Sequence, residues 1–247
     1  ASGEWGMGNG EWGMVKEEAE LLIAARNASP TRHSPLAIHH SPFTTRPKTH
    51  ILAPMLGLKL PTDPRWADLA GKSIEEILTD HAYCEQKATS TAISLIQNYP
   101  EHEWLIEALT PLVVEEWGHF KLVLEQLKKR GLKLGKQRKD EYVNQLYKFL
   151  RHGGSRADSL VEKLLFSALI EARSCERFKV FSKGVDDKEL AQFYKNLMVS
   201  EAGHYRMFLD MACDLGGKEK VLARWDEWLE YEAGVMRSID VRGDRIH

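Results

Sequence analysis

The chain has 247 residues, 43% hydrophobic and 28% charged, which is long enough to bury a sizeable core. Its formal net charge of -2 gives no overall preference for nucleic acid or membrane, so such binding would need a local patch. Three cysteines without a Cys-x-x-Cys pair argue against a disulfide framework and a zinc knuckle. Because neither a signal sequence nor an apolar run of about 18 residues is present, we expect a cytoplasmic protein without a membrane partner.

Residues 1–50 differ in composition from the rest of the chain. Residues 1–14 are rich in glycine, and four prolines interrupt residues 28–50. Between them, only residues 16–27 fit a short helix. We interpret residues 1–50 as an N-terminal extension, irregular or in part a cloning remnant, and assign it no chemistry. Its four histidines are interpreted as loop residues rather than metal ligands: His33, His39, His40 and His50.

From residue 51 onward, long helical patterns alternate with Pro, Gly and Asn breakers. They predict a core bundle of four helices at about residues 73–215 and an amphipathic C-terminal helix at about residues 218–238. No segment alternates apolar and polar residues as a half-buried strand does. We therefore predict one all-α domain over residues 51–247, a four-helix bundle with additional flanking helices.

The second long helix, at about residues 101–130, places two polar residues on its apolar face. The inward stripe consists of Leu105, Leu109, Leu112, Glu116, His119, Val123 and Leu127. An ionised carboxylate in a core costs several kcal/mol unless it is paired or binds a metal. Glu116 and His119, a Glu-x-x-His motif, therefore need a partner.

The fourth long helix repeats this feature with Glu201 and His204, again in line with its apolar stripe. The first and third helices each offer a further inward carboxylate, Glu85 and Glu171. In an antiparallel helix pair, residues equidistant from the turn lie at the same level. One predicted turn falls nearly midway between Glu85 and the first motif, the other nearly midway between Glu171 and the second. All four levels can therefore coincide.

Four carboxylates and two imidazoles at one level of a helix bundle match the arrangement of di-iron and di-manganese carboxylate proteins. Oxygen and nitrogen donors suit iron or manganese, and four carboxylates balance two divalent cations. The alternative is a bundle whose core polar residues are salt-bridged to Lys or Arg. The predicted metal ligands are Glu85, Glu116, His119, Glu171, Glu201 and His204.

Further polar residues lie near the predicted ligands. His81 and Thr89 lie one turn from the first inward glutamate and could orient it, or could be hydrogen-bonded core residues without a chemical role. Glu115 and Glu176 are rotated off the inward stripes by about 100° and 140°. Together with Arg173 they are interpreted as surface or supporting residues rather than metal ligands.

A basic segment, residues 128–139, contains seven cations and no acid. These are Lys128, Lys129, Arg130, Lys133, Lys136, Arg138 and Lys139. Such a segment could neutralise the phosphates of a nucleic acid, with an affinity that falls steeply with salt. The alternative is a solvated loop whose cations cap the preceding helix. In the C-terminal helix, Trp225 and Trp228 share one face and are predicted to pack on the bundle.

Five segments carry a resemblance to a known enzyme family: ILAPMLGLKLPTDPRWADLA (51–70), DHAYCEQKATSTAISLI (80–96), LVVEEWGHF (112–120), LIEARSCERF (169–178) and VSEAGHYRMFL (199–209). They resemble the tRNA hydroxylases that act on 2-methylthio-N6-isopentenyladenosine beside the anticodon. The resemblance implies a ferritin-like fold, a non-haem centre of two iron ions and O2-dependent hydroxylation of the isopentenyl side chain. It also implies tRNA as the substrate and the same six ligands.

Two features qualify this resemblance. The family commonly has Arg directly before each His ligand, whereas Gly118 and Gly203 stand there in this chain. The chain also lacks a flavin, nicotinamide or rubredoxin-like motif, so we expect an external electron donor, a reductase or a ferredoxin. The alternative functions are a ferritin-like or rubrerythrin-like ferroxidase, a di-iron oxidase acting on another substrate, and a metal-free interaction bundle. The oligomeric state and the choice of iron over manganese stay open.

Overall fold

The computed structural model describes residues 56–247, and none of these residues belongs to a strand. The helices are α2 (Arg65–Gly71), α3 (Ile74–Asn98), α4 (Glu103–Lys129), α5 (Glu141–Tyr147), α6 (Arg156–Gly184), α7 (Lys188–Gly216) and α8 (Lys218–Ser238). The predicted all-α fold class is therefore confirmed. The predicted extension over residues 1–50, with its helix at 16–27 and its histidines, lies outside the described residues.

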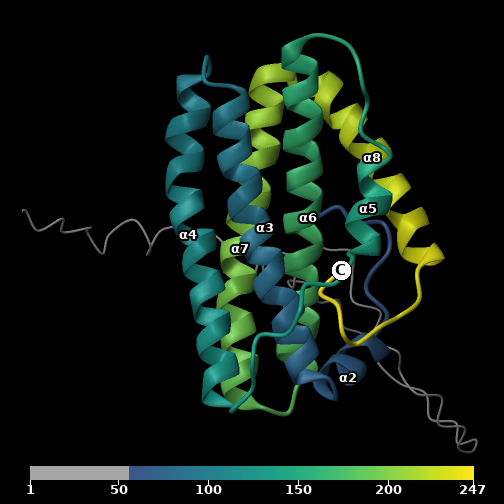
Figure 1. Cartoon of the computed structure of the whole chain (residues 1–247). Helices are drawn as coiled ribbons and strands as arrows, with labels where there is room; N and C mark the ends of the chain where they lie inside the picture. Colours follow the sequence, from purple (N-terminus) through teal and green to yellow (C-terminus); the bar gives the residue numbers. More distant parts are fainter. Residues whose placement is uncertain (1–55) are drawn as a thin grey trace, which may run out of the picture. The chain divides into compact units, whose positions relative to one another are not determined.

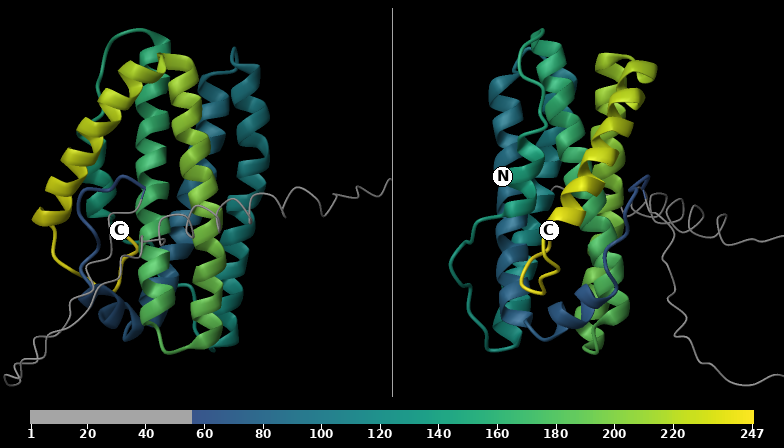
Figure 2. Two further views of the ribbon diagram at one scale, coloured as in Figure 1. Left: turned by 180° about the vertical axis from the view of Figure 1, so that it is seen from behind. Right: turned by 90° about the vertical axis from the view of Figure 1, so that its right-hand side faces the viewer.

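Four long helices, α3, α4, α6 and α7, stand side by side along a common direction (Figure 1). The pairs α3 with α4 and α6 with α7 make the most extensive contacts, and each pair is joined by a short turn. A long crossover that contains α5 connects the two pairs. The short helices and α8 flank the bundle (Figure 2). Because partners in each pair run antiparallel, residues at equal distances from a turn meet at one level.

Local signals in the sequence explain where these helices begin and end. Ser155 and Asp158 form a reciprocal capping box at the start of α6. The side chain of Asp187 accepts hydrogen bonds from two backbone N–H groups at the start of α7. Gly217, at φ +83°, separates α7 from α8 in a backbone conformation that L side chains rarely adopt. These caps set the helical phase of the inward residues.

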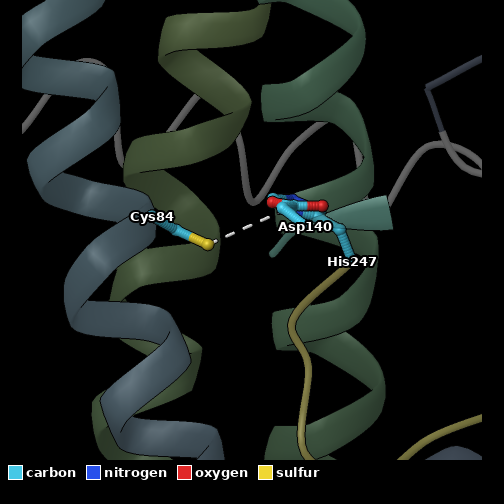
Figure 3. A group of neighbouring side chains, drawn as sticks. All are labelled: Cys84, Asp140 and His247. Atoms are coloured by element: carbon cyan, nitrogen blue, oxygen red, sulfur yellow. Dashed lines mark hydrogen bonds between the residues drawn. The ribbon is translucent and has the colours of Figure 1, made fainter. Parts of the chain in front are cut away.

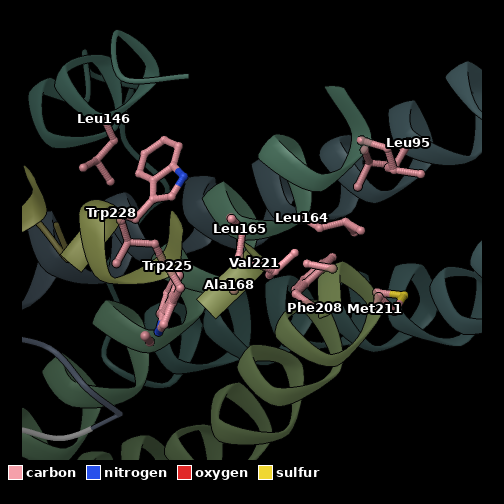
Figure 4. Close-up of a cluster of buried hydrophobic side chains, with 14 of the residues drawn as sticks. Leu95, Leu146, Leu164, Leu165, Ala168, Phe208, Met211, Val221, Trp225 and Trp228 are labelled. Carbon is pink, nitrogen blue, oxygen red and sulfur yellow. The ribbon is translucent and has the colours of Figure 1, made fainter. Parts of the chain in front are cut away.

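The apolar core lies between α6, α7 and α8 and extends between the four long helices (Figure 4). Leu164, Leu165 and Ala168 of α6 are fully buried there. Trp225 and Trp228 of α8 belong to the same cluster, so their predicted packing on the bundle is confirmed. α8 therefore covers the face of α6 that points away from α4.

Two short helices, α2 and α5, were not predicted from the sequence, because seven residues are too few to establish a helical period. α5 begins at Asp140, whose side chain accepts a hydrogen bond from the backbone N–H of Val143. After α8 the chain turns back to the bundle. The backbone N–H of Ile246 donates to Asp80 of α3 at 2.8 Å, and the indole of Trp66 donates to the carbonyl of Arg245. This return brings His247 next to α3 and α6.

Within residues 56–247, no helix is both long enough and apolar enough to cross a bilayer.

Candidate metal centre

The six residues predicted as ligands meet in the interior of the four-helix bundle. They come from all four long helices, and each is no more than 7% exposed. We call Glu85, Glu116, His119, Glu171, Glu201 and His204 the carboxylate cluster. Their role as metal ligands stays a proposal, but the predicted convergence of their side chains is what the structure has.

The carboxylate cluster divides into two overlapping sets of donors. One set is Glu85, Glu116, His119 and Glu201; the other is Glu116, Glu171, Glu201 and His204. Within each set, one ligand atom per residue lies within 4.8 Å of every other. Glu116 and Glu201 belong to both sets. Such a division fits two neighbouring metal ions with two carboxylates between them.

Both imidazoles present Nδ1 to the carboxylates. Nδ1 of His119 lies 3.6 Å from Glu116, 3.7 Å from Glu85 and 3.8 Å from Glu201. Nδ1 of His204 lies 2.8 Å from Oε1 of Glu116, but without the geometry of a hydrogen bond, because that oxygen has no hydrogen-bond partner. Nδ1 of His204 is hydrogen-bonded with Oε2 of Glu201 at 3.4 Å, whereas Nδ1 of His119 faces three carboxylates without a hydrogen bond to any of them.

Four buried atoms of the cluster have no hydrogen-bond partner: Oε1 of Glu116, Nδ1 of His119, Oε1 of Glu201 and Nε2 of His204. A buried polar atom left in this state costs about 1–3 kcal/mol. Among the described residues, neither Lys nor Arg forms an ion pair with the cluster; the ion pairs of its carboxylates are all with histidines. The alternative of a polar core neutralised by Lys or Arg is therefore not found there.

The pKa values of the cluster express its excess of negative charge. Burial, and then the nearby Glu116, raise the pKa of Glu85 well above its ordinary value. Burial and Glu201 do the same for the pKa of Glu171. Burial lowers the pKa of His119, but the surrounding carboxylates outweigh it and raise that pKa to about 11. In the absence of cations, the cluster must hold protons, which is the behaviour of a site built for positive charge.

Comparison with known proteins decides the family. The family model for tRNA-(MS[2]IO[6]A)-hydroxylase (MiaE) matches residues 50–247. The chain belongs to this family. The resemblance seen in the five sequence segments is thereby confirmed.

Two curated relatives and one solved structure agree with this membership. A protein from Pseudomonas putida named tRNA 2-(methylsulfanyl)-N(6)-isopentenyladenosine(37) hydroxylase is 38% identical, over 66% of this chain and 78% of the relative. A protein of the same name from Salmonella typhimurium is 30% identical, over 80% of this chain and 90% of the relative. A Synechococcus protein described as having aldehyde deformylating oxygenase activity is similar with a TM-score of 0.72 and 31% identity, covering 77% of this chain and 94% of that one.

In this member of the MiaE family, His81 connects the cluster to the bundle wall. Its Nε2 lies 2.5 Å from Oε1 of Glu85, and its Nδ1 lies 3.1 Å from the hydroxyl of Tyr194. Burial lowers the pKa of His81 to about 3, so the ring is neutral. With Glu85 ionised, the neutral ring can donate from Nε2–H to Glu85 and accept at Nδ1 from the Tyr194 hydroxyl. Thr89 fits the second of the two interpretations, a hydrogen-bonded core residue, because its hydroxyl donates to the backbone carbonyl of Glu85.

Glu115 lies against the far side of both imidazoles, although its position is off the inward stripe. One carboxylate oxygen is 3.8 Å from Nε2 of His119, and the other is 3.4 Å from Nε2 of His204. The hydroxyl of Ser200 donates to the same carboxylate. His204 lowers the pKa of Glu115, so the carboxylate is negative. Glu115 can thus favour the tautomer in which Nε2 carries the proton and Nδ1 is free to bind a metal.

Arg173 and Glu176 face away from the cluster, toward α8. The guanidinium of Arg173 donates to Glu176 at 3.0 Å and to Glu232 of α8 at 2.8 Å. Glu176 also accepts a hydrogen bond from the backbone N–H of Thr62. These residues form a buried ionic network that we call the α6–α8 network. It is separate from the carboxylate cluster.

The basic segment is partly neutralised by the protein itself. Lys129 pairs with Glu189 at 2.6 Å, Arg130 pairs with Asp187, and Arg138 pairs with Asp244 at 3.0 Å. The remaining cations are exposed and form no ion pair with a described residue: Lys128, Lys133, Lys136 and Lys139. Four of the seven predicted cations are therefore free to meet an external anion.

Gly118 and Gly203, where the sequence departs from the family pattern, border open space. A Cβ atom added at either position would meet no atom within 4 Å. The glycines are therefore not required by close packing. A larger side chain can be accommodated beside each histidine.

Proposed function

We propose that the protein hydroxylates the isopentenyl side chain of 2-methylthio-N6-isopentenyladenosine in tRNA, next to the anticodon. Molecular oxygen is the co-substrate, and two iron ions are the cofactor. The observation that carries this proposal is the pair of overlapping buried donor sets in a chain of the MiaE family. The family supports the substrate, and the cluster supports the cofactor.

The donor set fits a pair of iron ions. Glu85 and His119 would hold one ion, and Glu171 and His204 the other. Glu116 and Glu201 belong to both donor sets and would be shared. When bound, such a pair supplies the activation of O2 for insertion into a C–H bond. Manganese prefers similar ligands, so the choice of iron rests on the family.

Residues of the chain would balance the charge of the metal ions, orient their ligands and exclude bulk water. Four carboxylates balance the charge of two divalent ions, which lowers the free energy of burying them together. His81 holds Glu85 through a hydrogen bond from Nε2, and Glu115 faces Nε2 of both ligand histidines. The cluster residues are at most 7% exposed, so bulk water is kept from the reacting atoms.

The reaction needs electrons from outside the chain. Hydroxylation consumes one O2, two electrons and two protons; one oxygen atom enters the C–H bond and the other leaves as water. We expect a reductase or ferredoxin to supply the electrons. The four unpaired lysines of the basic segment are proposed to contact tRNA phosphates, and we expect the protein to meet its tRNA in the cytoplasm.

The direct test is a single-turnover experiment. The protein is loaded with Fe2+ without oxygen, mixed with tRNA that carries 2-methylthio-N6-isopentenyladenosine, reduced chemically and exposed once to O2. Mass analysis of the digested nucleosides should show that this nucleoside gains one oxygen atom. If iron binds and O2 is consumed while the nucleoside stays unchanged, the substrate assignment is wrong and a ferroxidase or another oxidase function takes its place.

A further inference from the structure

A cavity of about 80 Å³ adjoins the carboxylate cluster and includes Glu171 in its lining. It lies between the long helices, α5 and the returning segment at His247. In its lining, Leu112, Ser167 and Phe208 are buried. Thr91 is exposed, and Lys87 and Asp140 are half-buried. The cavity therefore leads from the surface toward the candidate metal centre.

The inner end of the cavity lies one helical turn from the cluster on every long helix. Ala88 follows Glu85 by three residues, and Leu112 precedes Glu116 by four. On the other helix pair, Ser167 precedes Glu171 by four residues and Phe208 follows His204 by four. One turn corresponds to about 5.4 Å along a helix axis. A group in this cavity would thus lie beside the cluster without displacing its residues.

The chemistry of the lining selects an apolar occupant. Phe166, Ile170 and Val143 line the cavity together with Leu112 and Phe208. Phe166, Ile170 and Val143 are only half-buried, so they have apolar surface to offer a ligand. An apolar cavity of about 150 Å³ holds a six-carbon ring, which scales to roughly three carbons here. Three carbons are the branched end of an isopentenyl chain.

One side of the cavity carries polar groups. Cys84, Asp140 and His247 approach one another there (Figure 3), with Sγ of Cys84 3.9 Å from Nδ1 of His247. These three do not form a second metal site. Asp140 is already neutralised by Lys87 at 2.8 Å and caps α5, while Nε2 of His247 is hydrogen-bonded with Ser174 at 2.9 Å. The half-buried Lys87 and Asp140 instead provide a polar rim beside the exposed Thr91.

We propose that this cavity binds the branched end of the isopentenyl chain and presents a methyl group to the metal centre. The purine then stays at the polar rim, next to Asp140, which directly follows the basic segment. The assignment rests on the proposed function and specifies how the same site selects its substrate. It names Ala88 and Ile170 as residues that determine specificity.

The test measures binding by metal-free protein, so that it does not depend on catalysis. Two synthetic anticodon stem-loops are compared, one with N6-isopentenyladenosine and one with adenosine at the same position. Burial of about three carbons predicts a roughly 10–100-fold preference of the wild type for the isopentenyl form. Ala88→Phe fills the cavity and should abolish this preference. Ala223→Phe, the same change on an exposed part of α8, should retain it.

A second variant tests the same cavity in case Ala88→Phe does not fold. Ile170→Ala enlarges the cavity and should lower the preference about fivefold while leaving the iron content of the loaded protein unchanged. If wild-type protein shows no preference, or if Ala88→Phe and Ile170→Ala both keep it, the cavity assignment is wrong. Hydroxylation by wild type in the single-turnover test then still supports the proposed function, so the two failures are distinguishable.

Discussion

α6 carries buried charged residues on two opposite faces. The faces differ in whether their carboxylates are paired with a cation of the protein. Toward α8, Arg173 donates hydrogen bonds to Glu176 and Glu232, so negative and positive groups neutralise each other. Toward the bundle centre, Glu171 joins three further glutamates, and no described Lys or Arg compensates them. The first arrangement contains its own cation, and Oε2 of Glu232 is its one carboxylate oxygen without a hydrogen-bond partner. The second contains no described Lys or Arg, which is why we propose it, and not the first, as the metal site.

The largest effect, on iron loading and hydroxylation, is expected for a substitution in the carboxylate cluster. Glu171→Ala removes a ligand from one donor set, so iron loading should fall below two ions and hydroxylation should drop at least ~1000-fold, because a metal ion supplies several kcal/mol of transition-state stabilisation. Metal analysis and the nucleoside assay measure both. Glu125→Ala, an exposed carboxylate on α4, is the matched control and should change neither. Full iron binding by Glu171→Ala would contradict the assignment.

A substitution in the α6–α8 network is expected to lower stability and to leave iron loading unchanged. Glu232→Ala leaves Arg173 buried without one of its two counter-charges, so the metal-free protein should lose about 3–5 kcal/mol of unfolding free energy in urea. Iron loading of the folded fraction should stay at two ions. Glu230→Ala, on the exposed side of α8, should cost less than about 1 kcal/mol. Equal stability losses for Glu171→Ala and Glu232→Ala would erase the distinction between the two faces.

A smaller effect is expected for a residue beside the cluster. Glu115→Gln removes the negative charge that faces Nε2 of His119 and His204, so iron affinity should fall about 10–100-fold while two ions still bind at saturation. An anaerobic competition with a coloured chelator measures this affinity. Glu125→Gln serves as the control. An unchanged affinity would mean that Glu115 does not influence the imidazoles.

The smallest effect concerns the basic segment, where paired and unpaired cations can be compared. Lys133→Ala with Lys136→Ala removes two unpaired cations, and the logarithmic salt slope of tRNA binding should fall by roughly 0.7–0.9 for each phosphate that is no longer neutralised. Lys129→Ala, which removes a cation paired with Glu189, should change the slope less. Filter binding over a range of salt concentrations gives both values. Equal slopes for wild type and both variants would indicate that this segment does not touch tRNA.

The carboxylate cluster could be derived from sequence because helical phase and hairpin symmetry act over long, regular elements. Other features depend on tertiary interactions that phase does not encode. Glu115 points about 100° from the inward stripe, yet it reaches both imidazoles because Ser200 of α7 holds its carboxylate. Arg138 is neutralised by Asp244, which lies 106 residues away in the chain. The sequence therefore shows seven cations in the basic segment but does not show that three of them are paired within the protein.

The short helices and the cavity also could not be predicted from the sequence. A seven-residue helix such as α5 shows no resolvable period. The cavity is lined by all four long helices, by α5 and by His247. The segment that ends at His247 is held at the bundle by hydrogen bonds with Asp80, Trp66 and Ser174. Its lining therefore depends on segments far apart in the chain, and no single helical pattern predicts how they meet.

The most direct test of the central claim is an anaerobic titration of the metal-free protein with Fe2+, with bound iron counted and the unfolding temperature recorded. We expect two ions per chain and a higher unfolding temperature, since a ligand held a hundredfold above its dissociation constant adds about 2.7 kcal/mol to the free energy of unfolding. In Glu171→Ala, both responses should be reduced. A wild-type protein that binds no iron and unfolds at the same temperature with and without it would contradict the claim.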